Sequence, residues 1–409
     1  MGWRSWLGLE EPEVKAASYT FDDLLRDYYG QTNSKAGQSV TLQTALETSA
    51  VFGCARVIAE GISQVPWKLY RRDDAKGRVE AREHPLFRVL HRRPNDWQTS
   101  FEFRETIAFH LALCGNAYVY VSRNRRGEVM ELLPYEPGCV AVKRNTDMTI
   151  TYHLKLRDGR YVEVPQSSMW HVRGPSWNGW EGLYATHLAR NAIGLSLATE
   201  EFGSSLFANG ARPGGLLTTD QGLDEDRAVL IRKAWQDAQG SSGNAMKTAV
   251  LHSGLKYMPL SYNADEAQYN ETQSAALNRI CAFFRVNPIM VMQTQGTAAY
   301  ASVEQMFLAH LTHTLMPWFE RIEQSADVNL LTTKEQDDGY YTKLEAKGLM
   351  RGTSKERAEY NQIMLQNGVV SRNEVRASED MDLVDDLEFS KPMPAANLYG
   401  PETPAAAGE

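Results

Sequence analysis

The sequence is poor in the residues that usually staple small domains or bind metals. Its 409 residues include four cysteines, Cys54, Cys114, Cys139 and Cys281, and no two of them form a C-x-x-C pair. This spacing argues against a zinc site and a disulfide framework, and it is typical of a protein made in a reducing cytosol. A chain of this length is expected to hold two or three domains with cores large enough to need no staples.

Long hydrophobic runs and an excess of basic charge are also missing. No stretch has the length and apolarity of a transmembrane helix, and the first six residues match neither a signal peptide nor a myristoylation site. We therefore expect assembly in a cytoplasm and no membrane partner. Lysine and arginine number 43 against 51 aspartates and glutamates, which gives a net charge of -8. This balance argues against a static nucleic-acid coat but permits a protein that surrounds DNA loosely.

Sequence signatures of catalysis are absent or weak. The chain contains no G-x-x-x-x-G-K-[ST], no G-x-S-x-G and no H-E-x-x-H. One alternative stays open, a metal-dependent hydrolase or nuclease that uses Asp224, Glu225 and Asp226, or else His310 and His313. The acids stand at a predicted helix start, where they complement the helix dipole, and the histidines lack their usual motif. We expect no enzyme activity, no cofactor and no bound metal.

Hydrophobic periodicity predicts a mixed α+β fold. A predicted helix over 42–64 ends before Val65-Pro66, a strand covers 67–70, a short helix covers 84–93, and a capping box of Thr99 and Glu102 opens a helix that runs to Cys114. Residues 117–172 read as β, with a hairpin signal at Asp158-Gly159.

The second half of the chain predicts long helices around a small insertion. The helices cover 183–208 and 265–284, and a β-α-β-β unit with strands at 215–219, 249–251 and 257–260 lies between them. A capping box at Ser302 and Gln305 is expected to open another helix, which Pro317 should kink. Residues 340–376 read as two helices.

Residues 286–302, VNPIMVMQTQGTAAYAS, contain no charged residue. The stretch is too short and polar to span a membrane and too rich in Gly, Thr and Gln for a core helix. It offers hydroxyls, amides and methyl groups but nothing ionic. Because phosphate affinity comes from Lys and Arg, such a surface suits duplex DNA that slides without being held.

The order and spacing of several motifs resemble the portal proteins, or head-to-tail connectors, of tailed bacteriophages. The resemblance covers roughly residues 44–380 and departs from the usual pattern at Asn287, where the family shows a proline, and at Ser302, where it shows an asparagine. The motifs are 50–59 AVFGCARVIA, 65–70 VPWKLY, 84–86 HPL, 93–95 RPN, 115–118 GNAY, 170–173 WHVR, 207–211 FANGA, 284–288 FRVNP and 300–305 YASVEQ.

The resemblance implies a portal fold with named parts. They are a flexible N-terminal segment (1–40), an α/β wing (41–182), a first stem helix (183–209), a small α/β clip (210–263), a second stem helix (264–285), a tunnel loop (286–302), a helix that returns to the wing (303–339), a helical crown (340–389) and a disordered tail (390–409). It also implies a ring, dodecameric in the virion, at one capsid vertex, through which double-stranded DNA is packaged and ejected.

Two sets of contact residues follow from that reading. The tunnel loop is expected to line the DNA channel through Met290, Val291, Met292, Gln293, Thr294, Gln295, Thr297 and Tyr300. The clip is expected to contact the packaging motor and the adaptor through Arg227, Arg232, Lys233, Asp237, Ser241 and Ser242. The partners implied are further copies of the chain, the terminase large subunit, the major capsid protein and a head-tail adaptor protein.

Overall fold

The computed structural model describes most of the chain. The described residues are 33–73, 77–156, 158–208, 216–219, 224, 226, 229–231, 233–234, 255–258, 265–292, 300–346, 354–379 and 381–393. The chain divides into two compact units, Met1–Leu344 and Glu345–Glu409. The described helices include none that is long and apolar enough to span a lipid bilayer.

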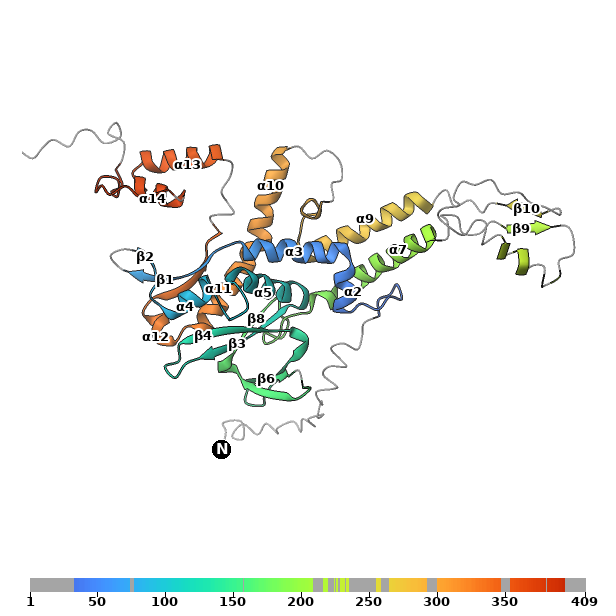
Figure 1. The fold of residues 1–409 in the computed structure, drawn as a ribbon, viewed down its shortest axis with the longest axis horizontal. Coiled ribbons are helices and arrows are strands. Elements are labelled where there is room, and N and C mark those ends of the chain that lie inside the picture. The colour runs from blue at the N-terminus through green and yellow to red at the C-terminus, as the bar shows by residue number, and fades with distance from the viewer. Residues whose placement is uncertain are drawn as a thin grey trace, which may run out of the picture. The chain divides into compact units, whose positions relative to one another are not determined.

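The core of the first unit is a helical layer on a three-stranded antiparallel sheet (Figure 1). Helices α3 (Ser49–Ser63) and α5 (Ser100–Cys114) pack on each other, and α5 packs on β3. The sheet has the order β4-β3-β8, formed by Val129–Tyr135, Asn116–Arg123 and Met169–Arg173. Trp67 and Trp170 are fully buried with ring centroids 5.8 Å apart, so large aromatic side chains fill the centre of the unit.

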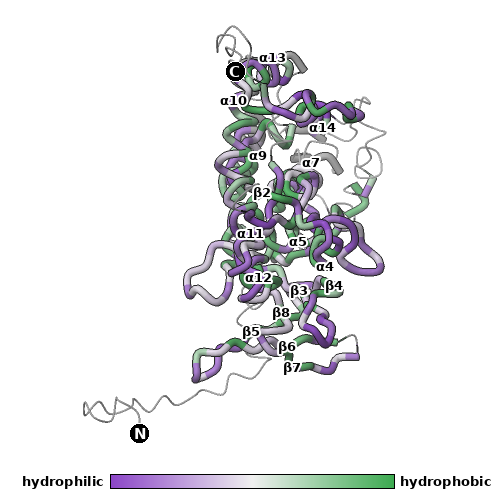
Figure 2. Tube along the Cα trace, turned by 90° about the vertical axis from the view of Figure 1, so that its left-hand side faces the viewer, coloured by the Kyte–Doolittle hydropathy of each residue, from purple (hydrophilic) through white to green (hydrophobic). Residues whose placement is uncertain are grey.

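Two further three-stranded sheets flank this core. One has the order β11-β1-β2, from Tyr340–Leu344, Trp67–Asp73 and Gly77–Glu80, and α4 (Pro85–His91) packs beside β1. The other has the order β5-β6-β7, from Val140–Arg144, Ile150–Lys155 and Tyr161–Pro165. Hydrophobic and hydrophilic residues are mixed along β6 and β7 in Figure 2, as expected for a sheet with one covered face.

The chain then leaves the core through short α6 (Ala185–Leu188) and long α7 (Arg190–Ala208) and returns through α9 (Asp265–Phe284). Between them lies an antiparallel pair, β9 (Leu216–Thr219) with β10 (Leu255–Met258). A 3₁₀ turn at Pro288–Val291 follows α9. The chain then returns to β11 through α10 (Tyr300–His310), a π-helical turn (Leu311–Leu315), α11 (Met316–Leu330) and α12 (Thr333–Asp337). The second unit contains α13 (Ser354–Gln366) and α14 (Arg372–Ser378).

Several predicted elements are confirmed. The capping box of Thr99 and Glu102 opens α5, and Gly115 ends it in the left-handed conformation at φ 66°. The β reading of 117–172 holds, and Asp158-Gly159 lies between β6 and β7, with Gly159 at φ 82°. The strand predicted at 67–70, the short helix at 84–93 and the helix at 265–284 also form.

Two predicted single helices are each two helices in the structure. The helix expected over 42–64 breaks into α2 (Leu42–Glu47) and α3 because Thr48 is extended, at φ -72° and ψ 115°. The helix expected over 183–208 is interrupted at Ala189, where ψ is 0°. Hydrophobic periodicity continues across both breaks, so the pattern alone did not show them.

Other predictions were wrong in position or type. Ser302 does not cap α10, because the helix begins two residues earlier at Tyr300. The helix irregularity expected at Pro317 is a π-helical turn over the preceding residues 311–315, which continues without a break into α11. The segment 340–376 contains strand β11 as well as two helices. The strand expected at 257–260 lies at Leu255–Met258, and the one at 249–251 falls outside the described residues.

Candidate functional site

Helices α7 and α9 form a pair that the rest of the first unit covers only at its base. Side chains near the base are fully buried, namely Ile193 of α7 and Ala276 and Ile280 of α9. Residues 271–275, in the middle of α9, are all exposed. Phe202 on α7 contacts Tyr269 of α9 at a centroid distance of 6.2 Å and is still 55% exposed. The pair therefore presents a long surface, including apolar side chains, that no other described element covers.

Close packing between the two helices depends on a glycine. A Cβ atom at Gly203 would lie 2.3 Å from the hydroxyl oxygen of Tyr269, so the side chain of Tyr269 lies directly over the α7 backbone. Since Gly203 is near the end of α7 and Tyr269 near the start of α9, the helices run antiparallel (Figure 1). This arrangement brings the end of α9 back to the core, where the charge-free segment begins.

The start of the charge-free segment is fixed against the core. Arg285 ends α9 at φ 56°, the N–H of Val286 donates to the carbonyl of Cys281, and Thr314 Oγ1 donates to the carbonyl of Arg285 at 2.7 Å. The side chain of Asn287 accepts a hydrogen bond from the N–H of Ile289, so it caps the 3₁₀ turn. Asn287 therefore has a local structural role.

The predicted channel-lining residues differ in how the structure places them. Met290 and Val291 are partly buried, and a Cβ at Gly53 of α3 would lie 3.2 Å from Val291 Cγ1, so Val291 packs on the core. Met292 has the left-handed φ of 61° and is 90% exposed. Tyr300 is the first residue of α10. Gln293, Thr294, Gln295 and Thr297 lie outside the described residues.

The helix after the segment carries an irregularity with a buried histidine. The π-helical turn Leu311–Leu315 joins α10 to α11, and His310 just before it is buried, with its pKa lowered by desolvation. His313 is exposed. Single π turns recur at functional sites because they offset a helix without ending it.

The structure describes only some of the residues proposed for the alternative hydrolase. Asp224 and Asp226 are exposed, Glu225 falls outside the described residues, and His310 and His313 differ in burial. Across the part of the chain that the structure describes, no group of three or more His, Cys, Asp or Glu side chains could hold a metal ion.

The residues expected to contact the motor fall mostly outside the described part. Lys233 is helical and exposed, whereas Arg227, Arg232, Asp237, Ser241 and Ser242 are not described. The described part of this insertion includes the β9–β10 pair, in which Leu216 pairs with Met258.

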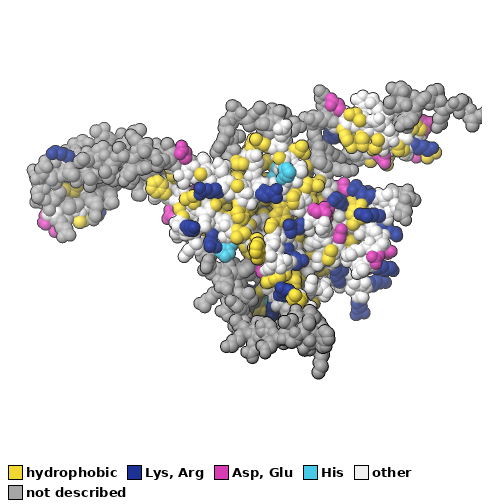
Figure 3. Space-filling model, turned by 180° about the vertical axis from the view of Figure 1, so that it is seen from behind, with side chains coloured by type: hydrophobic (Ala, Val, Ile, Leu, Met, Phe, Trp, Pro, Cys, Tyr) yellow, Lys and Arg dark blue, Asp and Glu magenta, His cyan; other side chains and the backbone are white. Residues whose placement is uncertain are grey.

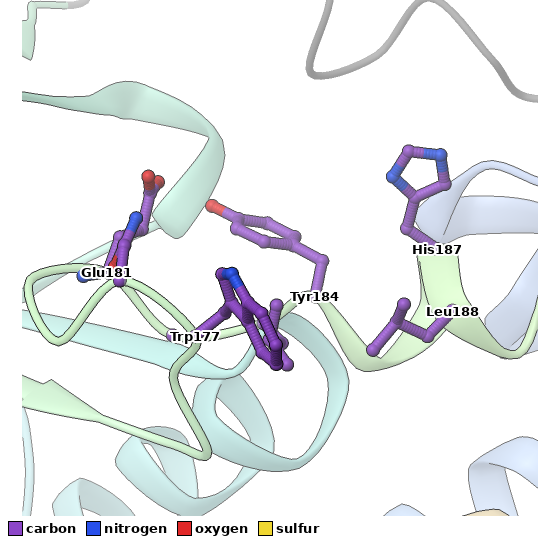
Figure 4. A pocket seen from close by; sticks show the side chains of 8 residues that line it. Trp177, Glu181, Tyr184, His187 and Leu188 are labelled. Carbon is purple, nitrogen blue, oxygen red and sulfur yellow. Dashed lines mark hydrogen bonds between the residues drawn. The ribbon is translucent and has the colours of Figure 1, made fainter.

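Sequence reasoning missed a pocket beside the start of α6. The cavity has a volume of about 210 Å³ and is lined by residues of the loop after β8 and of α6, among them Trp177, Glu181, Tyr184, His187 and Leu188 (Figure 4). Trp177 is 91% exposed. Burial raises the pKa of the Glu181 carboxyl to about 7. The signal was the sequence 174–184, GPSWNGWEGLY, in which three glycines and two tryptophans stand close together.

A buried polar network fixes the base of this loop. His171 Nε2 donates to Asn116 Oδ1 at 3.0 Å, and the same oxygen accepts the N–H of Gly182 at 2.7 Å. Asn116 Nδ2 donates to the carbonyls of Cys114 and Gly182. Desolvation lowers the pKa of His171 to about 3, so the imidazole is neutral and its Nδ1 can accept from Tyr152.

Comparison with known proteins gives a consistent result. The model of the phage portal protein family matches residues 49–380. The chain is 28% identical to the portal protein of Enterobacteria phage HK97, over 84% of this chain and 81% of that one. It is 30% identical to the probable portal protein of Streptomyces phage phiC31, over 85% and 77%.

A solved structure shares the fold. The chain superposes with a TM-score of 0.57 and 20% identity on a structure described as the neck of a native GTA particle computed with C12 symmetry, over 84% of this chain and 93% of that chain. GTA denotes a gene transfer agent. At this identity the likeness supports the fold alone.

Proposed function

The chain belongs to the phage portal protein family, and we propose that twelve copies of it close into a ring that joins head to tail at one capsid vertex. The family places the chain among structural proteins of the virion rather than among enzymes. The number twelve takes its support from the C12 symmetry given for the related neck structure. A closed ring needs one heterologous interface repeated around an axis.

One observation carries the channel proposal. The α7–α9 pair is uncovered over its distal part and leads directly into a segment without charge. In a ring around an axis, the uncovered faces of the helix pair would contact neighbouring copies. The segment 286–302 of every copy would then lie at the bore. The proposed parts of the subunit are the wing (41–182), the stem helices (183–209 and 264–285), the clip (210–263), the tunnel loop (286–302), the returning helix (303–339) and the crown (340–389).

The chemistry of the segment suits transport rather than binding. Gln293, Thr294, Gln295 and Thr297 can donate hydrogen bonds to phosphates that are readily replaced as the duplex advances. The thioether of Met292, which is 90% exposed where the described part of the segment ends, supplies a pliable apolar surface. Double-stranded DNA would therefore meet a wall that offers many weak contacts and no fixed cation.

Other partners follow from the same assembly. We assign docking of the terminase large subunit and of the head-tail adaptor protein to the clip, including Arg227, Arg232, Lys233, Asp237, Ser241 and Ser242. The wing would face the major capsid protein. Packaging energy would come from the terminase, because the chain has no phosphate-binding G-x-x-x-x-G-K-[ST] loop.

The test replaces Gln293 and Gln295 together by lysine. Twelve copies of two added cations would hold phosphate groups, so DNA packaging in vitro should slow or stall while ring assembly is preserved. The matched control is Gln166→Lys in the 3₁₀ turn before β8, an exposed glutamine of the wing. Packaging rates that stay unchanged in the double variant would count against a channel-lining role.

A further inference from the structure

The loop between β8 and α6 is held rigidly although its outer surface is exposed. Asn178 Oδ1 accepts the backbone N–H groups of Trp180 and Glu181, and Ser176 Oγ accepts the N–H of Gly179. The N–H of Leu183 donates to the carbonyl of Pro175 at 2.7 Å, which closes the loop at its base. A loop braced in this way loses little conformational entropy when a partner binds it.

The glycines at its base bring three backbone segments into contact. A Cβ at Gly182 would lie 1.9 Å from the carbonyl oxygen of Gly115, and a Cβ at Gly115 would lie 2.0 Å from that of Leu183. The N–H of Gly174 donates to the carbonyl of Gly115 at 2.7 Å. The loop therefore cannot shift without disturbing the end of α5 and the start of β3.

The two tryptophans of this braced loop differ in exposure. Trp180 is partly buried and packs on the hydrophobic cluster that contains Tyr118, Tyr152 and Leu154. Trp177 is 91% exposed, with its indole beside the pocket, and Leu188 of α6, also exposed, stands across from it (Figure 4). A large aromatic side chain held outward on a braced loop is typical of an interface anchor, because tryptophan dominates binding hot spots.

The pocket contains one carboxyl group. Glu181 is partly buried, and the described residues place no Lys or Arg in a salt bridge with it. Burial favours its neutral form, and a bound cation would favour the carboxylate. The indole of Trp177 and the ring of Tyr184 add aromatic faces, which attract Lys and Arg side chains.

We propose that the pocket of Trp177, Glu181 and Tyr184 receives an arginine or lysine side chain from the neighbouring copy of the chain. The proposal rests on the ring inferred above, since a heterologous interface pairs a site on one face with a different surface of the next copy. The chain has suitable side chains: Arg88, Arg92 and Arg125 are exposed and form no ion pair among the described residues. Figure 3 shows Lys and Arg gathered on the right-hand edge of the first unit, where β1 and β2 lie.

The direct test places a photo-crosslinking benzoylphenylalanine at position 177 of the full chain. Rings are assembled from a mixture of ¹⁴N- and ¹⁵N-labelled chains, irradiated and analysed by mass spectrometry. The expected products join one light and one heavy chain, and the partner peptide contains an arginine or lysine near the crosslink. Crosslinks confined to one chain, or to residues 1–32 of the same copy, would overturn the proposal.

A substitution test separates this proposal from the proposed function. Trp177→Ala and Glu181→Gln should each raise the protein concentration at half assembly by about tenfold or more. Trp97→Ala, which removes another exposed tryptophan, should leave it unchanged. If Trp177→Ala rings form as readily as wild-type rings, the pocket proposal fails alone. If the wild-type chain forms no ring, the proposed function fails and the pocket proposal falls with it.

Discussion

The sheet region of the first unit and the α7–α9 pair differ in how completely the single chain buries their side chains. Around β3 and β8, the buried side chains of Asn116 and His171 hydrogen-bond to each other, and closely packed glycines bring backbone segments into contact. Along α7 and α9, side chains as large as Phe202 stay half exposed. The difference agrees with the proposed ring, in which neighbouring copies would cover the helix pair and the sheet region would need no contact from them.

The largest effect is expected where backbone meets backbone in the wing. Gly182→Ala would place a methyl group 1.9 Å from the carbonyl oxygen of Gly115, which cannot move aside as a flexible side chain could. Unfolding in urea should show a loss of about 3 kcal/mol. Gly179→Ala in the same loop meets open space and carries only the strain of φ 80°, about 1 kcal/mol. Equal losses in the two variants would contradict the proposed close packing.

The second effect is a pH dependence of stability that comes from the buried hydrogen-bond network of Asn116 and His171. The pKa of His171 is about 3 in the folded chain, below its ordinary value of 6.5, so the unfolded chain binds the proton more readily. The contribution of this network to the free energy of unfolding is therefore complete above pH 6.5 and is lost as the pH falls toward 3. His110, with a pKa of about 4, adds a loss of the same sign.

The measurement is the free energy of unfolding at several pH values for wild type and His171→Gln. The variant should lose less stability between pH 6.5 and 4 than wild type, whatever its stability at pH 7. His153→Gln, on the neighbouring β6, serves as the control, because it removes a histidine that is not part of the buried network. A His171→Gln slope identical to that of wild type would show that the imidazole is not the group that titrates.

The smallest effect on subunit stability is expected on the helix pair. Phe202→Ser removes a half-exposed ring and should change the unfolding free energy of the subunit by less than about 1 kcal/mol. The same variant should weaken the ring, measured as the dissociation midpoint in native mass spectrometry, because the neighbouring copies would cover this face. Met130→Ser on β4, similarly exposed, should leave the ring unchanged. If the two variants change the dissociation midpoint of the ring equally, the distinction between the two regions is wrong.

Much of the fold could be predicted because local signals agreed with the tertiary structure. The Thr99 and Glu102 capping box and the Asp158-Gly159 turn fix their elements through hydrogen bonds and φ angles of nearby residues. Strand β11 was missed because its partner is β1, some 270 residues earlier, as in the pairing of Trp67 with Leu344. Such long-range pairing leaves only a short run of β-forming residues in the sequence.

The candidate site was partly predictable. The charge-free segment is visible in the sequence as an absence, but its packing is not: Val291 lies against Gly53 of α3, while Met292 next to it is exposed. The pocket of Trp177 was missed because nothing local distinguishes it from Trp180, which faces inward three residues later. The contacts that fix the base of this loop join Asn116, Gly115 and Gly182, which come from separate parts of the chain.

Cryo-electron microscopy of the assembled chain would show where the charge-free segment lies. The expected map is a closed ring with an axial hole, with α7 and α9 of each copy around the axis and Met292 beside the bore. A map of a ring in which Met292 and the residues after it lie on the outer perimeter would contradict it.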